Sequence, residues 1–515
     1  MSAKFILSID IGTQSTRAVL ISETGEISDI EKIKIQAYYS ENPGWAEQDP
    51  ELFWDVAVKA MKAVIGRNGD KAGMIKAVTL TTQRGTVVNL DKDNNVLRPA
   101  IIWLDRRQAK AENWIGLVKK VGLWFINMLG AADYAYREAE VNWIKQNQPE
   151  IWAKTSKYLL LSGFINFRLT GKFRDSVANQ VGYLPFNYKK HRWIKKYTNV
   201  RKVMFDVDEE KLPELVKPGE EIGRISKEVA QLTGLNEGIP VIAASADKSA
   251  EVLGSGVVDS STVCLSYGTT ATVQSVSEKY VELQPFFPPY PSAIPGKYNT
   301  EVMVYRGFWM IDWFKNEFGS KEVEKAKELG VEPEKLLDEL ICDIPPGAMG
   351  LTLQPYWSAG VKNPGLEAKG AIIGFGDVHT RKHIYRAIIE GLAYALRNGF
   401  EHTKRKTGIN PGKIVVSGGG SQSDIIMQIT ADVFGIPAVR PHTYETSALG
   451  AAIDTAVALG WYNSFEEAAK KMTCADKIFH PNKENHDMYD RIYKEVYNKM
   501  YDRLKPLYTS IRNIF

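Results

Sequence analysis

The chain contains few cysteines and no long apolar segment. Its 515 residues include three cysteines, Cys264, Cys342 and Cys474, which lie far apart and show no CxxC spacing. This pattern argues against a disulfide framework and against a zinc site, and it fits a reducing compartment. The apolar run at residues 5–9 is too short for a signal peptide or a membrane span, and no run approaches about 18 residues. We therefore expect a cytoplasmic protein with no membrane partner.

The chain also has no strong excess of charge of one sign. It carries 65 Lys and Arg against 61 Asp and Glu, for a formal net charge of +4. No basic field therefore points to nucleic acid as a partner. The phosphate-binding pattern GxxxxGK[ST] is absent, which argues against a P-loop enzyme, and the dinucleotide fingerprint GxGxxG is absent too. The length suits two domains rather than one.

Two segments of similar form suggest an internal repeat. Each reads as a strand, a turn that contains Gly-Thr, and a second strand: residues 5–9, 10–13 and 17–21, and residues 262–266, 267–270 and 271–273. Between and after them, predicted strands and helices alternate, which favours an α/β fold. We expect two similar domains, residues 1–252 and 253–515, each opening with such a hairpin.

The turn of the first hairpin carries groups suited to binding phosphate. Gly12 permits close approach of the backbone, and successive N–H groups in a tight turn form an anion-binding nest. Polar donors follow at Thr13, Ser15, Thr16 and Arg17. Asp10 is placed to help hold Mg²⁺, through water. A plain surface hairpin is the alternative interpretation of the same residues.

A glycine-rich segment lies in the second half of the chain. A predicted strand runs into Gly418, Gly419 and Gly420, and a predicted helix begins at about Ser423. Backbone without side chains at the start of a helix suits close approach of a nucleotide base or ribose. A tight strand–helix turn is the alternative, although such a turn does not need three consecutive glycines.

Asp247 follows an apolar predicted strand, residues 239–243, and precedes small residues that open a helix. A carboxylate at such a strand end can act as a base in a cleft. It can equally cap the helix by accepting hydrogen bonds from the first backbone N–H groups. The residues themselves leave both alternatives open.

In their order and spacing, these three segments resemble the FGGY family of carbohydrate kinases, over roughly residues 4–505. The resemblance is supported by four further segments, residues 44–50, 97–107, 168–171 and 447–452. It implies two ribonuclease H-like (actin-like ATPase) domains with an inter-domain cleft. It also implies that ATP and Mg²⁺ serve transfer of phosphate to a hydroxyl of a small sugar, polyol or sugar acid. Dimers are common in this family, so a homodimer is expected by analogy only.

The resemblance also implies roles for residues that match the family by position. Asp247 matches the catalytic base. The first hairpin is expected to bind the transferring phosphate through Thr13, Gln14, Ser15 and Arg17. Asp10 is expected to help hold Mg²⁺. The positions that match the phosphate and adenosine contacts of the second domain are Gly268, Thr269, Gly419 and Ser423.

The residues expected to line the acceptor site are Gln83, Arg84, Trp103, Asp247 and Lys248. Glycerol kinases usually have Arg-Glu where this chain has Arg84 and Gly85, and xylulokinases usually have Met-His-Gly at residues 83–85, so the chain is a hybrid. Arg84 suits bidentate recognition of hydroxyl or carboxylate groups. Trp103 is either an apolar wall of the site or a core residue.

Three positions depart from the family pattern. Lys248 stands where Gln is common, a Lys is absent near Glu140, and Gly163 replaces a common Asp. A cation at 248 beside Arg84 suggests an anionic or strongly electron-rich acceptor, such as an aldonate. The alternative is a salt bridge to Glu251 on the same helical turn.

Two other functions remain as alternatives. One is an actin-like ATPase without a small-molecule acceptor, and the other is a catalytically dead sensor on the same fold. The acceptor-side residues and Asp247 argue for a kinase, because an ATPase does not need them. Near the C-terminus, tyrosines recur at every fourth position, at 489, 493, 497 and 501. They predict a helix that packs on its own domain, or a partner surface.

Overall fold

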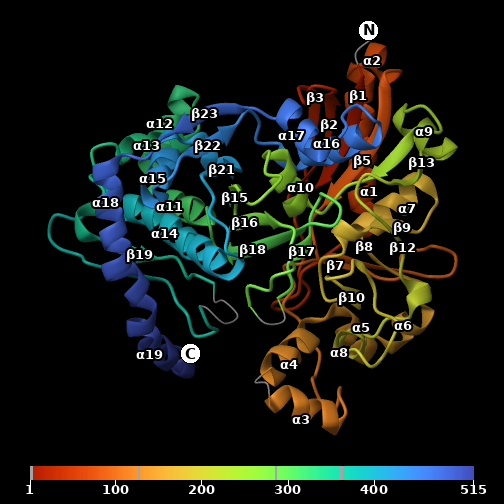
Figure 1. Cartoon of the computed structure of the whole chain (residues 1–515), viewed down its shortest axis with the longest axis horizontal. Coiled ribbons are helices and arrows are strands. Elements are labelled where there is room, and N and C mark those ends of the chain that lie inside the picture. Colours follow the sequence, from red (N-terminus) through yellow and green to blue (C-terminus); the bar gives the residue numbers. More distant parts are fainter. Residues whose placement is uncertain (1–3, 126–127, 285–286, 359–363) are drawn as a thin grey trace. The chain divides into compact units, whose positions relative to one another are not determined.

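Figure 1 shows a computed structural model of the chain, which describes residues 4–125, 128–284, 287–358 and 364–515. The chain forms two compact units. Unit 1 comprises Met1–Val258, Ser277–Asn299 and Thr446–Thr473, and unit 2 comprises Asp259–Val276, Thr300–Glu445 and Cys474–Phe515. The chain thus returns to unit 1 twice after leaving it. Among the described residues, no helix is both long and apolar enough to cross a membrane.

The core of unit 1 is a six-stranded sheet. Its order is β13 (Glu221–Arg224), β14 (Pro240–Ala243), β5 (Ile75–Thr82), β1 (Phe5–Ile11), β2 (Ser15–Ser22) and β3 (Ile27–Lys34). The central strand β1 pairs antiparallel with β2 and parallel with β5. Every residue of β1 is buried, as expected for a strand that is covered on both faces.

Helices cover the two faces of β1. Phe5, Leu7 and Ile9 pack with α1 (Pro50–Arg67), which starts at the N-cap Asp49. Ile6, on the opposite face, packs with α16 (Thr446–Ala458). Because side chains alternate along a strand, Asp10 lies on the face of Ile6. The other helices that enclose this sheet are α7 (Leu161–Thr170), α9 (Lys227–Thr233), α10 (Asp247–Gly254) and α17 (Phe465–Met472).

A smaller four-stranded sheet completes unit 1. Its order is β4 (Glu47–Gln48), β7 (Ala100–Ile101), β6 (Val87–Leu90) and β8 (Lys157–Leu160). A separate apolar cluster packs around it, with Val87, Ile101 and Leu160 among its buried members. The sequence pattern predicts a strand over residues 100–104, and this is wrong at its end: β7 stops at Ile101. The chain turns there, because the N–H of Asp105 donates to the carbonyl of Ile102.

Unit 2 repeats the strand arrangement of unit 1. Six consecutive strands of its seven-stranded main sheet have the order β18 (Tyr298–Val304), β16 (Ala271–Ser277), β15 (Thr262–Tyr267), β21 (Lys413–Ser417), β22 (Ala438–Pro441) and β23 (Ala475–Phe479). Strand β15 pairs antiparallel with β16 and parallel with β21, as β1 does with β2 and β5. The predicted α/β fold with two similar hairpins is confirmed.

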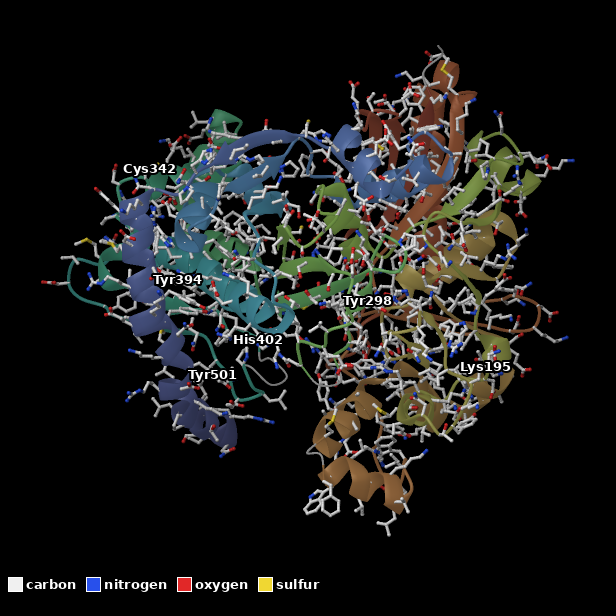
Figure 2. The ribbon with its side chains drawn as sticks, in the orientation of Figure 1. Lys195, Tyr298, Cys342, Tyr394, His402 and Tyr501 are labelled. Atoms are coloured by element: carbon white, nitrogen blue, oxygen red, sulfur yellow. The ribbon has the colours of Figure 1, made fainter. Side chains whose placement is uncertain are left out.

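The C-terminal helices pack on unit 2. They are α18 (Lys483–Ile492), a π-helical turn over Tyr493–Tyr497 and α19 (Asn498–Ile514), and they follow α14 (Arg381–Thr407) and α15 (Asp424–Phe434) in the chain. Tyr489, Tyr493 and Tyr497 are buried. They gather around Tyr394, which is labelled in Figure 2. The ring centroids of Tyr394 and Tyr497 lie 5.2 Å apart. The tyrosine stripe is therefore a packing face, as the first of the two interpretations predicts.

Candidate active site

The hairpin of β1 and β2 carries an ion pair at its base. Asp10 and Arg17 face each other in the strand register, and Arg17 Nη1 lies 2.9 Å from Asp10 Oδ2. Asp10 is buried, and Gln14 is the exposed residue at the tip. The turn closes through a hydrogen bond of 3.0 Å from the N–H of Gly12 to the carbonyl of Ser15.

A chain of hydrogen bonds connects this hairpin to the predicted acceptor residues. The hydroxyl of Thr13 donates to Gln83 Oε1 at 2.9 Å. Trp103 Nε1 donates in turn to Thr13 Oγ1, also at 2.9 Å. Gln83 follows β5 directly and is buried, whereas Trp103 is 40% exposed. The interpretation of Trp103 as a core residue is therefore wrong, and its ring is open to solvent beside the hairpin.

Asp247 is the first residue of α10 and does not occupy the N-cap position of that helix. The N-cap position belongs to Ala246, which makes no side-chain hydrogen bond. Oδ1 of Asp247 accepts from the N–H of Lys248 at 2.7 Å and lies 3.9 Å from Arg84 Nε. Asp247 is thus not the N-cap residue, although its carboxylate accepts one hydrogen bond from the first turn. The carboxylate also faces Arg84, and 27% of the side chain is exposed.

The environment raises the pKa of Asp247 from 3.8 to about 6. Burial is the largest cause, because it disfavours the charged form. The positive charges of Arg84 and Lys248 lower the pKa, and the negative charge of Asp10 raises it. The carboxyl is therefore mostly ionised at neutral pH and still basic enough to accept a proton.

Close backbone packing fixes the position of α10. A Cβ atom added to Gly450 would lie 1.9 Å from the carbonyl oxygen of Ala250, and one added to Gly254 would lie 1.9 Å from that of Thr446. Helices α10 and α16 thus touch backbone to backbone, which only glycine permits. The hydroxyl of Ser447 also donates to the carbonyl of Asp247 at 3.2 Å. The segment at residues 447–452 therefore holds the helix that carries the candidate base.

Arg84 stacks on an aromatic ring that the sequence pattern does not mark. Its guanidinium carbon lies 5.0 Å from the ring centroid of Tyr290, in β17 (Tyr290–Pro291). Lys248 Nζ donates to Glu251 Oε2 at 2.7 Å. The salt bridge that was one of two alternatives for Lys248 is thus present. An anionic acceptor stays a prediction.

In unit 2, the turn after β15 presents Gly268 and Thr269. Their carbonyls accept hydrogen bonds from the N–H groups of Phe308, at 3.0 Å, and Gly307, at 2.9 Å. These bonds fix the turn against the start of α11 (Trp309–Phe318). A Cβ atom on Gly307 would lie 2.3 Å from the backbone nitrogen of Ala271, so this contact also requires glycine.

The three consecutive glycines have different structural requirements. Gly418 has a φ of +84° and lies against the backbone of Tyr267, and a Cβ atom on Gly420 would lie 2.5 Å from the ring of Phe308. A Cβ atom on Gly419 would meet nothing within 4 Å. The packing of the described chain therefore explains Gly418 and Gly420 but leaves Gly419 unexplained.

Ser423 caps the helix that follows these glycines. After a 3₁₀ turn over Gly419–Gln422, the Ser423 hydroxyl accepts from the N–H of Ile426 at 3.2 Å, and α15 begins at Asp424. Asp338, in α13 (Pro333–Leu340), lies beside Ser423, and the sequence pattern does not predict this. Burial raises the pKa of Asp338 to about 6, and hydrogen bonding to Ser423 opposes this rise.

Two family models match this chain. The N-terminal domain of the FGGY family of carbohydrate kinases matches residues 5–254, and the C-terminal domain of that family matches residues 263–459. Xylulose kinase of Bacillus subtilis (strain 168) is 27% identical over 514 residues, which cover 99% of both chains. Glycerol kinase of Thermococcus onnurineus (strain NA1) is 30% identical over 491 residues, covering 93% of this chain and 94% of the relative.

A solved structure has the same fold. Ligand-bound xylulose kinase from Lactobacillus acidophilus superposes with a TM-score of 0.83 at 22% identity, covering 99% of this chain and 100% of the other. The expected two-domain, ribonuclease H-like architecture is therefore confirmed.

Proposed function

Because this chain belongs to the FGGY family of carbohydrate kinases, we propose that it phosphorylates a small sugar, polyol or sugar acid with Asp247 as the general base. The observation that carries the proposal is the carboxylate of Asp247. It is partly exposed, its pKa is raised to about 6, and it lies 3.9 Å from the guanidinium of Arg84. A base with this pKa takes a proton efficiently near neutral pH.

Residues 1–252 supply the acceptor side in this proposal. Gln83, Arg84, Trp103 and Lys248 hold the acceptor so that one hydroxyl points to Asp247. Arg84 is held by stacking on Tyr290, which leaves its N–H donors in a fixed plane. The exposed ring of Trp103 offers an apolar surface to the carbon-bound hydrogens of a sugar. Relatives named xylulose kinase and glycerol kinase support a small acceptor with several hydroxyls.

The proposed reaction moves one proton and one phosphoryl group. Asp247 accepts the proton of the attacking hydroxyl as the hydroxyl oxygen forms a bond to the γ-phosphorus. The bond from that phosphorus to the bridging oxygen breaks, and ADP leaves with the electron pair. The hairpin donors at Thr13, Gln14, Ser15 and Arg17 stabilise the charge on the transferring oxygens.

Residues 253–515 supply the nucleotide side. Gly268 and Thr269 contact the phosphates, and Gly419 and Ser423 contact the adenosine. Support comes from Gly419, which no neighbour within the described chain requires to be glycine. A nucleotide that approaches the backbone there would supply the missing reason.

Mg²⁺ is part of the proposal, with Asp10 as its protein ligand. No group of three or more metal-binding side chains occurs among the described residues. A single buried carboxylate still fits Mg²⁺, since this ion keeps several waters and takes further oxygens from the nucleotide phosphates. Bound there, it would neutralise charge on those phosphates.

Three free cysteines support a reducing, cytoplasmic location. A homodimer is proposed from family analogy alone.

Lys248 bears on which class of acceptor we propose. Together with Arg84 it places two cations beside the candidate base, which favours an acceptor with a carboxylate, such as an aldonate. Glu251 already neutralises Lys248, so the acceptor carboxylate would have to share this cation.

A coupled assay of ADP release tests the proposal across neutral polyols, ketoses and aldonates: glycerol, erythritol, xylitol, xylulose, ribulose and gluconate. We expect ADP release that depends on at least one of these acceptors. ADP release at the same rate with and without every acceptor would instead support an actin-like ATPase.

A further inference from the structure

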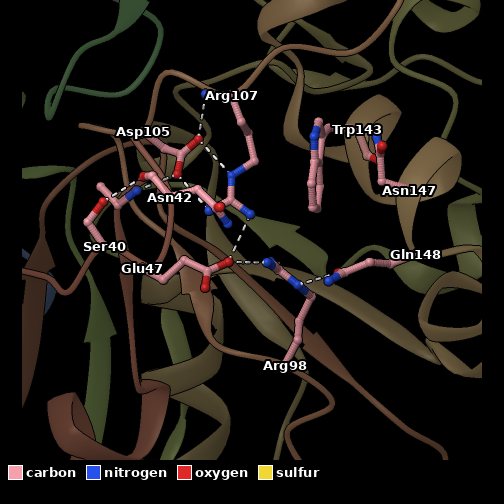
Figure 3. A network of polar contacts seen from close by, with 10 residues as sticks. Ser40, Asn42, Glu47, Arg98, Asp105, Arg107, Trp143, Asn147 and Gln148 are labelled. Carbon is pink, nitrogen blue, oxygen red and sulfur yellow. Dashed lines mark hydrogen bonds and ion pairs between the residues drawn. The ribbon is translucent and has the colours of Figure 1, made fainter. Parts of the chain in front are cut away.

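Two sequence segments that support the family resemblance meet in a buried charge cluster. The first is residues 44–50, which contain Glu47, and the second is residues 97–107, which contain Arg98, Asp105 and Arg107. Glu47 pairs with Arg98 on one side and Arg107 on the other, and Arg107 also pairs with Asp105 (Figure 3). No role proposed above uses these side chains.

The distances describe a network of charge-assisted hydrogen bonds. Glu47 Oε1 accepts from Arg98 Nη2 at 2.5 Å and from Arg107 Nη1 at 2.8 Å. Arg107 Nε and Nη2 each donate to a different oxygen of Asp105 at 2.8 Å. All four side chains are at most 7% exposed. Two acids thus compensate two guanidinium groups, as buried charges require.

Aromatic rings close around Arg107. Its guanidinium carbon lies 4.0 Å from the ring centroid of Trp45 and 4.6 Å from that of Trp143, which is drawn in Figure 3. The two indoles meet edge to face at 5.1 Å. Stacking and hydrogen bonding together leave this guanidinium a single orientation.

The cluster fixes the turn that carries Trp103. Asp105 Oδ2 accepts from the N–H of Ala46 at 2.6 Å. The N–H of Arg106 donates to the carbonyl of Gly44 at 2.7 Å, and that of Ile102 donates to the carbonyl of Ala46 at 3.1 Å. Both flanks of Trp103 are therefore tied to residues 44–46.

Trp103 needs such support because its own ring is open to solvent. It is 40% exposed, and its Nε1 donates a hydrogen bond to Thr13 Oγ1. Without anchored flanks, an exposed indole would sample several rotamers, and the bond would be populated only part of the time.

We infer that Glu47, Asp105 and Arg107 are positioning residues of the acceptor site: they hold residues 102–107 so that Trp103 stays bonded to Thr13. This inference rests on the proposed role of Trp103 in acceptor binding. Trp103 donates to Thr13, and Thr13 donates to Gln83. By holding Trp103 in place, the charge cluster therefore couples the acceptor pocket to the phosphate hairpin.

The chain offers a matched control for this inference. Arg98 pairs with the same oxygen of Glu47, but its other partner is Gln148 Oε1, at 2.8 Å, and not the turn at residues 102–107. Replacing Arg98 perturbs the cluster and its stability without releasing Asp105. Asp105→Asn keeps the shape of the side chain, but its amide N–H group would face the N–H donors of Arg107 or Ala46.

The test is hydrogen exchange at the Trp103 indole N–H of the full chain, followed by NMR with tryptophan labelled by ¹⁵N. Trp103→Phe assigns the signal. Thr13→Val should accelerate its exchange about threefold or more, because the acceptor of the bond is lost. Asp105→Asn should accelerate it similarly, while Arg98→Gln should lower Tm and leave the exchange rate near that of the unaltered protein. If Asp105→Asn fails to fold, Arg107→Lys replaces it, since a lysine cannot hold both oxygens of Asp105.

Activity gives a second readout, with the acceptor that is turned over fastest in the panel above. Asp105→Asn should raise the KM for that acceptor about tenfold and leave the KM for ATP unchanged. In a protein that already carries Trp103→Phe, Asp105→Asn should raise the acceptor KM little further, because both changes remove the same contact.

The inference is overturned if Asp105→Asn leaves the exchange of Trp103 unaltered, if Arg98→Gln accelerates it equally, or if Thr13→Val has no effect. It is also overturned if the two effects on KM simply add. If Trp103→Phe leaves the acceptor KM unchanged, the proposed role of Trp103 is wrong. The exchange experiment, which needs no substrate, still decides whether the cluster positions the indole.

Discussion

Replacing Asp247 by Asn should lower kcat by about 10²–10⁴-fold, which is the usual contribution of a general base. This corresponds to about 2.7–5.4 kcal/mol of activation free energy. The amide keeps the shape of the carboxylate and its contact to the N–H of Lys248, but it cannot take the acceptor proton. Because the change removes a charge beside Arg84 and Lys248, the assay must also follow acceptor KM.

The raised pKa of Asp247 adds a second, independent signature. With a pKa of about 6, roughly 97% of the carboxyl is ionised at pH 7.5 and roughly 10% at pH 5. A base must be ionised to act, so kcat/KM should fall as pH decreases through about 6. This decline should be absent from the residual activity of Asp247→Asn.

The assay is acceptor-dependent ADP release between pH 5 and 8.5, with Tm and the ATP dissociation constant measured on the same preparations. Both of these should change little, since the substitution is isosteric. The reasoning is refuted if the variant keeps more than about a tenth of kcat. It is equally refuted if the decline near pH 6 persists without the carboxylate.

Three further changes test separate parts of the account. Lys248→Gln keeps a hydrogen-bond donor for Glu251 but removes the cation, and it should lower kcat/KM for aldonates about tenfold while sparing neutral polyols; equal losses would argue against an anionic acceptor. Ser423→Ala should reduce stability by about 0.5–2 kcal/mol through loss of the α15 cap and should raise the KM for ATP. Ser423→Asn, which restores a capping group, should recover the Tm. Asp454→Leu should increase the free energy of unfolding by about 1–3 kcal/mol, because neither oxygen of this buried carboxyl has a hydrogen-bond partner among the described residues.

The effect at Asp454 should depend on pH with a defined sign. Burial raises the pKa of its carboxyl well above 3.8, so the folded protein holds this proton more tightly than the unfolded chain. Stability contributed at this position is therefore present at low pH and is lost as pH rises above the unfolded pKa. The gain from Asp454→Leu, measured by urea unfolding, should be larger at pH 8 than at pH 5. The opposite order would contradict the burial of a protonated carboxyl.

Local patterns were sufficient to predict the strands and hairpins that carry the site. A mostly apolar run followed by Asp10 and Gly12 predicts a buried strand and a turn, and the antiparallel register then places Arg17 opposite Asp10. The apolar strand before Asp247 likewise predicts a carboxylate at a strand end. These features depend on a few neighbouring residues, and the structure contains them.

Contacts between distant segments were beyond local patterns. Tyr290 stacks on Arg84 although about two hundred residues separate them, and nothing near Tyr290 marks it as a site residue. The small residues at 447–452 were visible, but their partner, the backbone of Ala250, was not. The helix begins one residue earlier than the N-cap interpretation of Asp247 requires. Ala246 occupies the N-cap position, and Asp247 is the first helical residue.

Exposure was equally hard to predict from composition. A tryptophan within an apolar stretch is usually buried, yet Trp103 is 40% exposed because β7 ends two residues earlier and the chain turns. The sequence pattern also could not assign partners to Glu47, Arg98 and Arg107, since charged residues are normally at the surface.

The fate of the γ-phosphate tests the central claim most directly. ³¹P NMR of a reaction with ATP, Mg²⁺ and the best acceptor of the panel distinguishes a phosphate monoester from inorganic phosphate. Transfer to the acceptor predicts that the monoester grows in step with ADP in the unaltered protein, and that Asp247→Asn nearly abolishes it. Inorganic phosphate as the sole product, at a rate that ignores the acceptor, would contradict the assignment of a carbohydrate kinase site around Asp247.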